Sequence, residues 1–281
     1  MIKNLPDIDK DTVHILEPSV GVGNFIPLII KKFEGKQIIL DVIDVDLHSI
    51  EIAKLIVGTY EIPENCEINY IHDDFLLHHF ERTYDYIIGN PPFLKMKSND
   101  KKLSIYRSNA INTITTNVCS YFMDKAVNIG NYISIVFPKL LLNTTEFAIT
   151  RKYLSKKEIE CIIDFGEKGF EGVLVETLAI FVNNLGRPAK TRIISIPLRK
   201  CITQSQKYIF DEKLPYWIIY RDTKFDSICK KMDFNVFKVF RDRQITNSKL
   251  NKVCGIRVLK SRNLSDDGKE ILDIDNYNSY I

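Results

Sequence analysis

The sequence lacks any apolar run of the about 18 residues that a membrane-spanning helix requires, and its amino terminus lacks a signal peptide's apolar core. Its six cysteines are scattered without a C-x-x-C pair, and the neighbours His78 and His79 are adjacent instead of one helical turn apart. These spacings do not suit a metal site. We therefore expect buried, reduced thiols, no bound metal and a cytoplasmic protein.

Internal repeats, low-complexity stretches and a large net charge are also missing. The 281 residues are 45% hydrophobic and 27% charged with a net charge of +3, which is typical of a globular protein with one catalytic domain and a smaller unit. The charge is uneven: residues 1–185 carry 19 Lys and Arg against 25 Asp and Glu, whereas residues 186–281 carry 20 against 11. A basic second region suits contact with phosphates, although a solvated lysine surface gives the same pattern.

The glycine loop near the amino terminus lacks the third glycine of the dinucleotide fingerprint, because Ile26 stands there. This disfavours a dehydrogenase. The loop follows the apolar run 13–16 and precedes a helical pattern, and this order opens a doubly wound α/β sheet. Gly21 and Gly23 allow a ligand to approach the backbone. Glu17, four residues before the first glycine, argues against a phosphate ligand and for a cationic or amine-bearing one.

Three further polar residues stand at the ends of apolar runs: Asp44 after 37–43, Asp74 within 68–77 and Asn90 after 84–89. In an open parallel sheet the carboxyl ends of the strands form the ligand-binding edge, so we expect these residues to surround one site with Glu17. Each carboxylate alone could be a helix cap. Four such positions in order, with the glycine loop first, make capping a poor explanation for all of them.

The tetrapeptide Asn90-Pro91-Pro92-Phe93 suits the binding of a planar amino group. The Asn90 side-chain oxygen can accept one N–H, and the carbonyl of Pro91, aimed by the rigid Pro-Pro step, can accept the other. Phe93 can stack on the ring that carries the amino group. An amino nitrogen held in this way becomes a nucleophile, which indicates amino-methyl transfer. A simple turn after a strand is the alternative for the tetrapeptide taken alone.

These segments resemble the S-adenosylmethionine-dependent DNA adenine-N6 methyltransferases of restriction-modification systems in which the cofactor motif precedes the catalytic motif. The resemblance covers about residues 13–182 and rests on four segments: 17–25, 43–46, 74–77 and 90–93. Three later segments resemble the family's next helix, its following strand and a hairpin near the target base: 121–130, 132–138 and 164–181. The resemblance implies a Rossmann-like methyltransferase sheet with a partial carboxyl-terminal target-recognition region.

The resemblance also implies roles for single residues. The cofactor contacts would be Glu17, Pro18 and the backbone of Gly21 and Gly23 at the methionine end, Asp44 at the ribose, and Asp74 with Phe75 at the adenine. The substrate adenine in double-stranded DNA would be flipped out of the duplex, because its amino nitrogen otherwise lies inside the helix. Asn90 and Pro91 would bind that amino group, Phe93 would stack on the base, and Phe170 is a candidate for its other face.

Two features depart from the family's pattern. The family usually has a cofactor-contacting segment before the glycine loop, commonly with Thr-Pro, whereas about a dozen residues precede the first strand here and residues 5–7 are no substitute. Phe93 stands where tyrosine is more frequent, which keeps the stacking and loses a hydroxyl. We expect that the missing segment weakens cofactor binding, comes from another chain, or marks a truncated or split enzyme.

The second region, 186–281, reads as a DNA target-recognition region. Residues 255–264, followed by Asp266-Asp267-Gly268, resemble an element of the target-recognition regions of such methyltransferases and of type I specificity subunits. Basic and aromatic side chains are interleaved in the segments 216–221 and 237–246. This pattern suits contacts to the DNA backbone and to base edges, but it is equally compatible with the two faces of an ordinary strand. We expect an incomplete recognition domain or one that a recognition or restriction subunit completes.

Several alternatives remain open at this point. Cytosine-N4 methyltransferases use a similar pocket but more often begin the motif with Ser. Protein-glutamine and RNA-guanine methyltransferases also use Asn-Pro-Pro-aromatic, but are usually short after it, whereas nearly 190 residues follow it here. A partner-dependent subunit that is inactive alone is the alternative to a complete enzyme. The DNA recognition sequence and the oligomeric state cannot be predicted from these residues.

Overall fold

The computed structural model of the chain describes all residues except 168–174, 234–235, 237–244 and 246. It contains two compact units, Met1–Asp222 and Thr223–Ile281. The first unit extends past residue 185, where we expected the catalytic domain to end, because two further strands continue its sheet. The assignment of 186–281 to DNA recognition stays a prediction.

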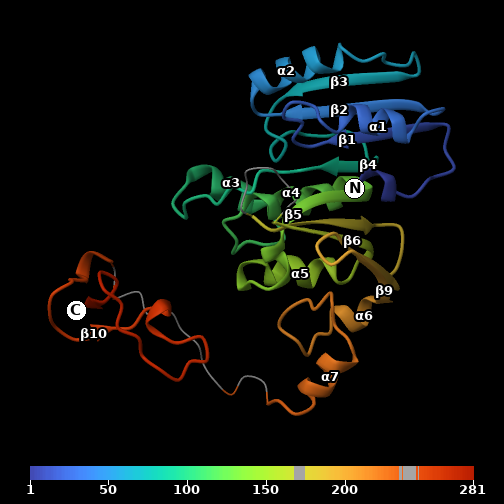
Figure 1. Cartoon of the computed structure of the whole chain (residues 1–281). Coiled ribbons are helices and arrows are strands. Elements are labelled where there is room, and N and C mark those ends of the chain that lie inside the picture. Colours follow the sequence, from blue (N-terminus) through green and yellow to red (C-terminus); the bar gives the residue numbers. More distant parts are fainter. Residues whose placement is uncertain (168–174, 234–235, 237–244, 246) are drawn as a thin grey trace. The chain divides into compact units, whose positions relative to one another are not determined.

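A nine-stranded sheet forms the first unit, in the order β3-β2-β1-β4-β5-β7-β6-β8-β9 (Figure 1). Its strands are β1 (Thr12–Glu17), β2 (Gln37–Asp44), β3 (Cys66–His72), β4 (Tyr84–Gly89), β5 (Gly130–Pro138), β6 (Glu158–Gly166), β7 (Thr177–Asn183), β8 (Lys190–Ser195) and β9 (Lys200–Ser205). Five neighbouring pairs are parallel, and β7 is antiparallel to both β5 and β6. The doubly wound α/β prediction is therefore confirmed.

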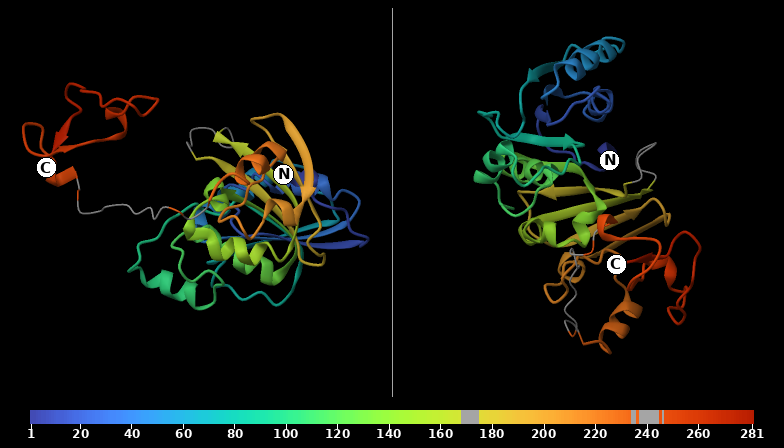
Figure 2. Two further views of the ribbon diagram at one scale, coloured as in Figure 1. Left: turned by 90° about the horizontal axis from the view of Figure 1, so that it is seen from below. Right: turned by 90° about the vertical axis from the view of Figure 1, so that its left-hand side faces the viewer.

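Helices cover both faces of this sheet (Figure 2). On one face α1 (Ile26–Lys32) and α2 (Leu47–Val57) bury apolar residues against inward-facing residues of β1 and β2. On the other face α4 (Val118–Ile129) and α5 (Ala148–Leu154) pack over β4, β5, β6 and β7. Burial on both faces explains why these strands read as near-continuous apolar runs in the sequence.

The strand order reverses at β1, whose neighbours in the sheet are β2 and β4. At such a switch point the connections leave in opposite directions and open a crevice at the carboxyl ends of the strands. The glycine loop follows β1 there and the Asn-Pro-Pro-Phe segment follows β4. The topology therefore brings the two sequence motifs to one edge.

The strands β8 and β9 extend the sheet beyond the segment that resembled a methyltransferase. β8 pairs with β6 in parallel, and β9 returns antiparallel to β8. The aromatic segment that follows packs inward: Trp217 stacks on Phe210 with ring centroids 3.9 Å apart, and both are buried in the core. Trp217 therefore has a packing role, and contact of the rest of 216–221 with DNA stays a prediction.

The second unit is small. It contains α7 (Thr223–Cys229) and a two-stranded sheet of β10 (Arg257–Val258) and β11 (Ser279–Tyr280). Asn263 is buried, and its side-chain amide donates to the Leu272 carbonyl and to the Asn278 side chain. The element predicted over 255–264 is thus held by polar contacts to the chain end. Most of 237–246 lies outside the described residues.

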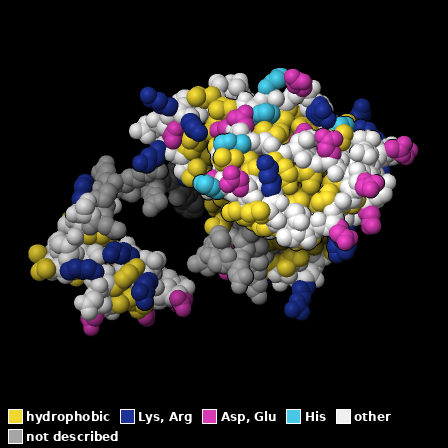
Figure 3. Space-filling view, turned by 90° about the horizontal axis from the view of Figure 1, so that it is seen from above, with side chains coloured by type: hydrophobic (Ala, Val, Ile, Leu, Met, Phe, Trp, Pro, Cys, Tyr) yellow, Lys and Arg dark blue, Asp and Glu magenta, His cyan; other side chains and the backbone are white. Residues whose placement is uncertain are grey.

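Two apolar side chains of α2, Ile52 and Leu55, are exposed. Figure 3 shows hydrophobic side chains interspersed with charged ones on the surface seen from above. No helix within the described residues is long and apolar enough to cross a membrane.

All six cysteines are free: Cys119 and Cys161 are buried, whereas the other four are half-buried or exposed. The expectation that all thiols are buried was therefore wrong for those four.

Candidate active site

A pocket of about 560 Å³ lies at the carboxyl ends of β1, β2 and β4. Several of the predicted site residues line it: Pro18, Gly21, Asp44, Asp74, Phe75, Asn90 and Pro92. The sequence analysis missed other lining residues, including Ser19, Lys102, Tyr106 and Phe122. All four segments on which the resemblance rests, 17–25, 43–46, 74–77 and 90–93, therefore contribute residues to one cavity.

The glycine loop is tied to the end of β2. The Val20 N–H donates to the Ile43 carbonyl (3.1 Å), and the Gly21 N–H donates to Asp44 Oδ2 (2.9 Å). Gly21 and Gly23 have φ of +51° and +82°, a region that side chains disfavour. A Cβ on Gly23 would also lie 3.2 Å from the Cβ of Ala53 on α2. Gly23 thus packs the loop on the helix and does not line the pocket.

Glu17 ends β1 beneath the pocket and is 1% exposed. Its Oε2 has no hydrogen-bond partner in the part of the chain that the structure describes. Burial, followed by the negative charge of Asp44, raises the pKa of Glu17 well above its usual range. A cationic ligand in this region would offset that cost, because an opposite charge favours the ionised carboxyl. The local electrostatics therefore match the prediction of a positively charged or amine-bearing ligand.

Asp74 follows β3 and already accepts two hydrogen bonds. The Leu76 N–H donates to Asp74 Oδ1 (3.0 Å), and the Tyr106 hydroxyl donates to Oδ2 (2.6 Å). Tyr106 lies on α3 (Lys101–Ser108), a helix that no sequence motif linked to the site. Phe75 is 3% exposed and packs on Phe122 with centroids 4.8 Å apart. Asp74 is therefore fixed by α3 and keeps the unused lone pairs of its carboxylate for a ligand.

The Asn90 corner is bound to the glycine loop. The Ser19 hydroxyl donates to the Asn90 carbonyl (3.0 Å). A Cβ on Gly89 would lie 2.8 Å from Cδ of Pro18, so only glycine allows β4 to end this close to the loop. Asn90 Oδ1 is buried and has no hydrogen-bond partner among the described residues. A buried acceptor left unpaired costs free energy, and this one belongs to a pocket-lining side chain.

The rest of the tetrapeptide is divided between the pocket and the core. Pro91 is buried and Pro92 lines the pocket. Phe93 is partly buried and packs against the core cluster that includes α4, and it does not line the pocket as the structure describes it. Phe170 lies outside the described residues, so its predicted place near the base stays a prediction, as does the stacking role of Phe93.

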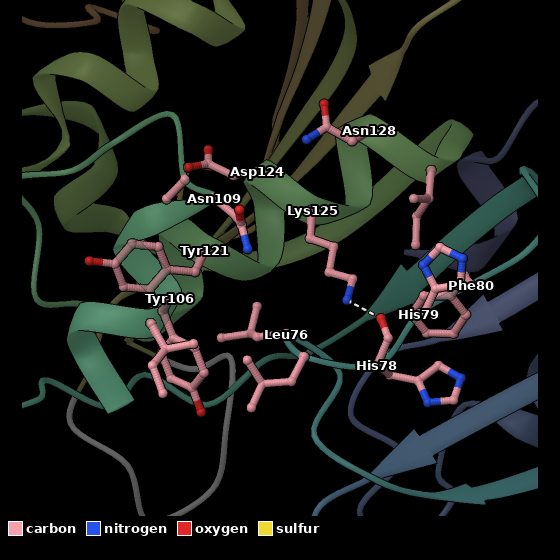
Figure 4. A pocket seen from close by; sticks show the side chains of 14 residues that line it. Leu76, His78, His79, Phe80, Tyr106, Asn109, Tyr121, Asp124, Lys125 and Asn128 are labelled. Atoms are coloured by element: carbon pink, nitrogen blue, oxygen red, sulfur yellow. Dashed lines mark hydrogen bonds between the residues drawn. The ribbon is translucent and has the colours of Figure 1, made fainter. Parts of the chain in front are cut away.

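A second cavity of about 370 Å³ adjoins this site and shares Leu76 and Tyr106 with it (Figure 4). Lys125 of α4 donates to the His78 carbonyl (2.5 Å) and lies 5.2 Å from the ring centroid of Phe75. Lys125 lines the second cavity and therefore contacts Phe75, which lines the first. Sequence spacing gave no signal for this cavity.

Asp124 lines the second cavity and is 2% exposed. Its Oδ2 accepts the N–H groups of Ile111 and Asn112, whereas no described residue hydrogen-bonds to Oδ1. Burial raises the pKa of Asp124 to about 6, against which the two N–H donors act. A carboxyl that binds its proton more tightly in the folded chain stabilises the fold at low pH.

We expect Asp124→Asn to reduce the pH dependence of stability. In the parent, the contribution of Asp124 to the free energy of unfolding is full below pH about 4 and is lost as the pH rises through about 6. The rise of its pKa from the ordinary value to about 6 corresponds to about 3 kcal/mol. Asn cannot lose a proton. Between pH 4 and pH 8, the free energy of unfolding measured with urea should therefore fall less in the variant than in the parent, by up to this amount. Asp9→Asn, at an exposed position, serves as the control, and an unchanged fall in Asp124→Asn would contradict the prediction.

The cofactor implied by the sequence resemblance is compatible with the site residues. S-adenosylmethionine carries a sulfonium, an ammonium, ribose hydroxyls and an adenine amino group, all of which carboxylates can bind. The site offers Glu17, Asp44 and Asp74. Within the described ranges, no three His, Cys, Asp or Glu side chains are grouped as metal ligands are.

Comparisons with known proteins give the family. The model of the Eco57I restriction-modification methylase family matches residues 23–170. Type II methyltransferase M.AccI of Acinetobacter calcoaceticus is 26% identical over 63% of the chain and 33% of its own length. M.VspI of Vibrio sp. (strain 343) is 28% identical over 62% of the chain and 43% of its own length. The chain thus spans less than half the length of these curated relatives.

The fold has counterparts among solved structures. The methyltransferase subunit of a type I restriction-modification system from Streptococcus thermophilus superposes with a TM-score of 0.57 at 14% identity, over 79% of this chain and 48% of that one. At this identity the likeness concerns the fold. The family match covers more than half of the chain, including the second glycine of the loop and the whole Asn-Pro-Pro-Phe segment. The chain therefore belongs to the Eco57I restriction-modification methylase family, whose methyl donor is S-adenosylmethionine.

Proposed function

We propose that this chain carries the catalytic domain of a DNA adenine-N6 methyltransferase of a restriction-modification system. The observation that carries the proposal is the buried Oδ1 of Asn90, which has no partner among the described residues, at the carboxyl end of β4. An amino N–H of a substrate base would satisfy this acceptor. Because that amino group lies inside the duplex in DNA, the base is taken out of the stack to reach it.

The chain's own residues position the amino group. Asn90 Oδ1 accepts one N–H and the Pro91 carbonyl accepts the other, which localises the nitrogen lone pair outside the ring. The Asn90 backbone is held in place by the Ser19 hydroxyl (3.0 Å) and by the contact of Gly89 with Pro18. Catalysis then rests on orientation and on hydrogen bonds that strengthen as the amino protons become acidic. No strong general base is required.

The cofactor would be held by carboxylates on neighbouring strand ends. S-adenosylmethionine supplies a methyl group activated by its positive sulfonium. Asp44 would bind the ribose hydroxyls, and Asp74 with Phe75 would bind the adenine. Pro18 and Gly21 would contact the methionine end, with Glu17 beneath them, while Gly23 would hold the loop against α2. Glu17 contributes through its buried negative charge, which a positive ligand favours.

Double-stranded DNA would be the substrate, and residues 186–281 would belong to its recognition region. The excess of Lys and Arg in this range, 20 against 11 Asp and Glu, supports this proposal. A separate recognition or restriction subunit is a further proposed partner, and the cytoplasm is the proposed location. The matched relatives are named Type II methyltransferases, which agrees with a DNA substrate.

Methyl transfer tests the proposal directly. The purified chain is incubated with S-adenosylmethionine labelled in its methyl group and with unmethylated genomic DNA, which is then digested to nucleosides. Label in N6-methyladenine is the expected result. Label in N4-methylcytosine would overturn the choice of base and keep the reaction type. No label, with cofactor binding retained, would contradict activity of the chain alone, and the assay repeated with an added recognition subunit would then decide partner dependence.

A further inference from the structure

A short basic segment follows the Asn-Pro-Pro-Phe corner. Residues 94–108 contain five Lys and Arg and a single acidic residue, whereas the rest of residues 1–185 contains 14 Lys and Arg against 24 Asp and Glu. The segment therefore has the opposite charge from the rest of the acidic half. It includes α3, which projects past the carboxyl ends of β1, β2 and β4 in Figure 1.

Backbone hydrogen bonds hold the first part of this segment beside the pocket. The backbones of Lys95 and Asn117 form an isolated antiparallel β-bridge. On either side of it, the Met96 N–H donates to the Thr116 carbonyl (2.9 Å) and the Val118 N–H donates to the Leu94 carbonyl (2.9 Å). Leu94 and Met96 line the pocket. Lys95 and Lys97 are exposed, and neither lines the pocket. The chain thus presents cations immediately outside the pocket.

The lysines of this segment differ in their partners. Lys95 pairs with Glu146 (3.0 Å), and Lys102, at the mouth of the pocket, lies 3.9 Å from Asp74 Oδ2. Lys97 and Lys101 are exposed and form no ion pair within the described part of the chain.

Stability of the fold does not explain these charges. Lys101 and Lys102 occupy the first two positions of α3, where Asp100 is the N-cap and where the helix dipole disfavours positive side chains. The charges at this end of the helix oppose its formation. A negatively charged ligand would remove this unfavourable effect on α3, because it would neutralise the ammonium groups of Lys101 and Lys102.

We propose that Lys97 and Lys101 bind backbone phosphates of the DNA next to the base held at Asn90. This inference rests on the proposed function and adds a contact surface within the catalytic domain, separate from the recognition region 186–281. Lysine ammonium groups are common phosphate ligands. Their place beside a pocket for an extruded base would fix the strand on which the base is carried.

The test is the salt dependence of DNA binding by the whole chain. The double variant Lys97→Gln/Lys101→Gln and the parent are titrated against a fluorescent 30-base-pair duplex between 0.05 and 0.2 M NaCl. Loss of two phosphate contacts lowers the magnitude of the slope of log K against log salt by about 2 and weakens binding by roughly 10- to 100-fold at 0.1 M. Cofactor binding, measured by calorimetry, should not change, because neither side chain lines the pocket.

The matched control removes two exposed lysines from the opposite edge of the sheet. Lys31, near the end of α1, and Lys156, just before β6, lie there, so Lys31→Gln/Lys156→Gln should keep the parent slope. Equal slopes for the parent and Lys97→Gln/Lys101→Gln would overturn the proposal, as would tighter binding of a single-stranded RNA of equal length or absence of DNA binding by the parent. Cofactor binding and methyl transfer report separately on the proposed function.

Discussion

Asn90→Ala is expected to abolish methyl transfer while cofactor binding is retained. The substitution removes the one buried acceptor of the pocket that has no partner in the described structure. Loss of a preorganised hydrogen-bonding group at a reacting centre costs about 10²–10³-fold in kcat. Single-turnover methylation with saturating S-adenosylmethionine measures this loss, and calorimetry with the same sample measures the cofactor Kd.

A matched substitution separates chemistry from folding. Asn128→Ala removes an exposed side chain on α4 that lines the neighbouring cavity and leaves Asn90 intact. It should keep kcat within a factor of a few. A fall in Asn90→Ala accompanied by an equal loss of cofactor affinity would mean that Asn90 holds the corner and not the amino group. An unchanged kcat would contradict the amino-binding role.

Much of the fold was predictable because its signals are local. The runs that form β1, β2 and β4 are mostly apolar; β1 and β2 end in Glu17 and Asp44, and Asn90 directly follows β4. The loop between β1 and α1 needs Gly21 and Gly23 at positive φ, so the strand–loop–helix unit is visible in the sequence. Since parallel strands align their carboxyl ends, the order of the motifs sufficed to bring Asp44 and Asn90 to one pocket.

The remaining features depend on contacts that sequence spacing does not encode. Tyr106 reaches Asp74 from 32 residues away because α3 folds back over the pocket. The parallel pairing of β8 with β6 follows from the packing of Ile193 and Ile162, which any apolar strand could offer. These long-range choices moved the boundary of the first unit from residue 185 to residue 222.

Phe93 shows which of its surroundings a motif predicts, although its stacking on a base stays a prediction. The motif predicted an aromatic side chain next to the amino-binding corner, and Phe93 stands there in the chain. Its ring packs against the core cluster, in contact with apolar residues instead of the pocket. Rotation of one side chain is decided by local packing density, which a single sequence does not reveal.

Asp44→Ala is expected to weaken S-adenosylmethionine binding about 100-fold. Hydrogen bonds from hydroxyls to a carboxylate contribute about 1.5–3 kcal/mol each, and the same side chain accepts the Gly21 N–H (2.9 Å) and the Asp46 N–H (3.0 Å). Removal would therefore lose both the ribose contact and the anchor of the glycine loop. Calorimetric titration of the variant with the cofactor measures the Kd.

Asp46→Ala is the informative control because it lies two residues away with a different task. Asp46 is the N-cap of α2, accepts the His48 N–H and is exposed, so its loss should lower the free energy of unfolding by about 1 kcal/mol and leave the Kd unchanged. Asp44→Asn, which keeps an acceptor for Gly21 but loses the charge, should lie between the parent and Asp44→Ala. If both Asp44 variants bound the cofactor as tightly as the parent, the ribose-binding role would pass to another residue; if only the Asn variant did, the loop anchor and not the charge would determine affinity.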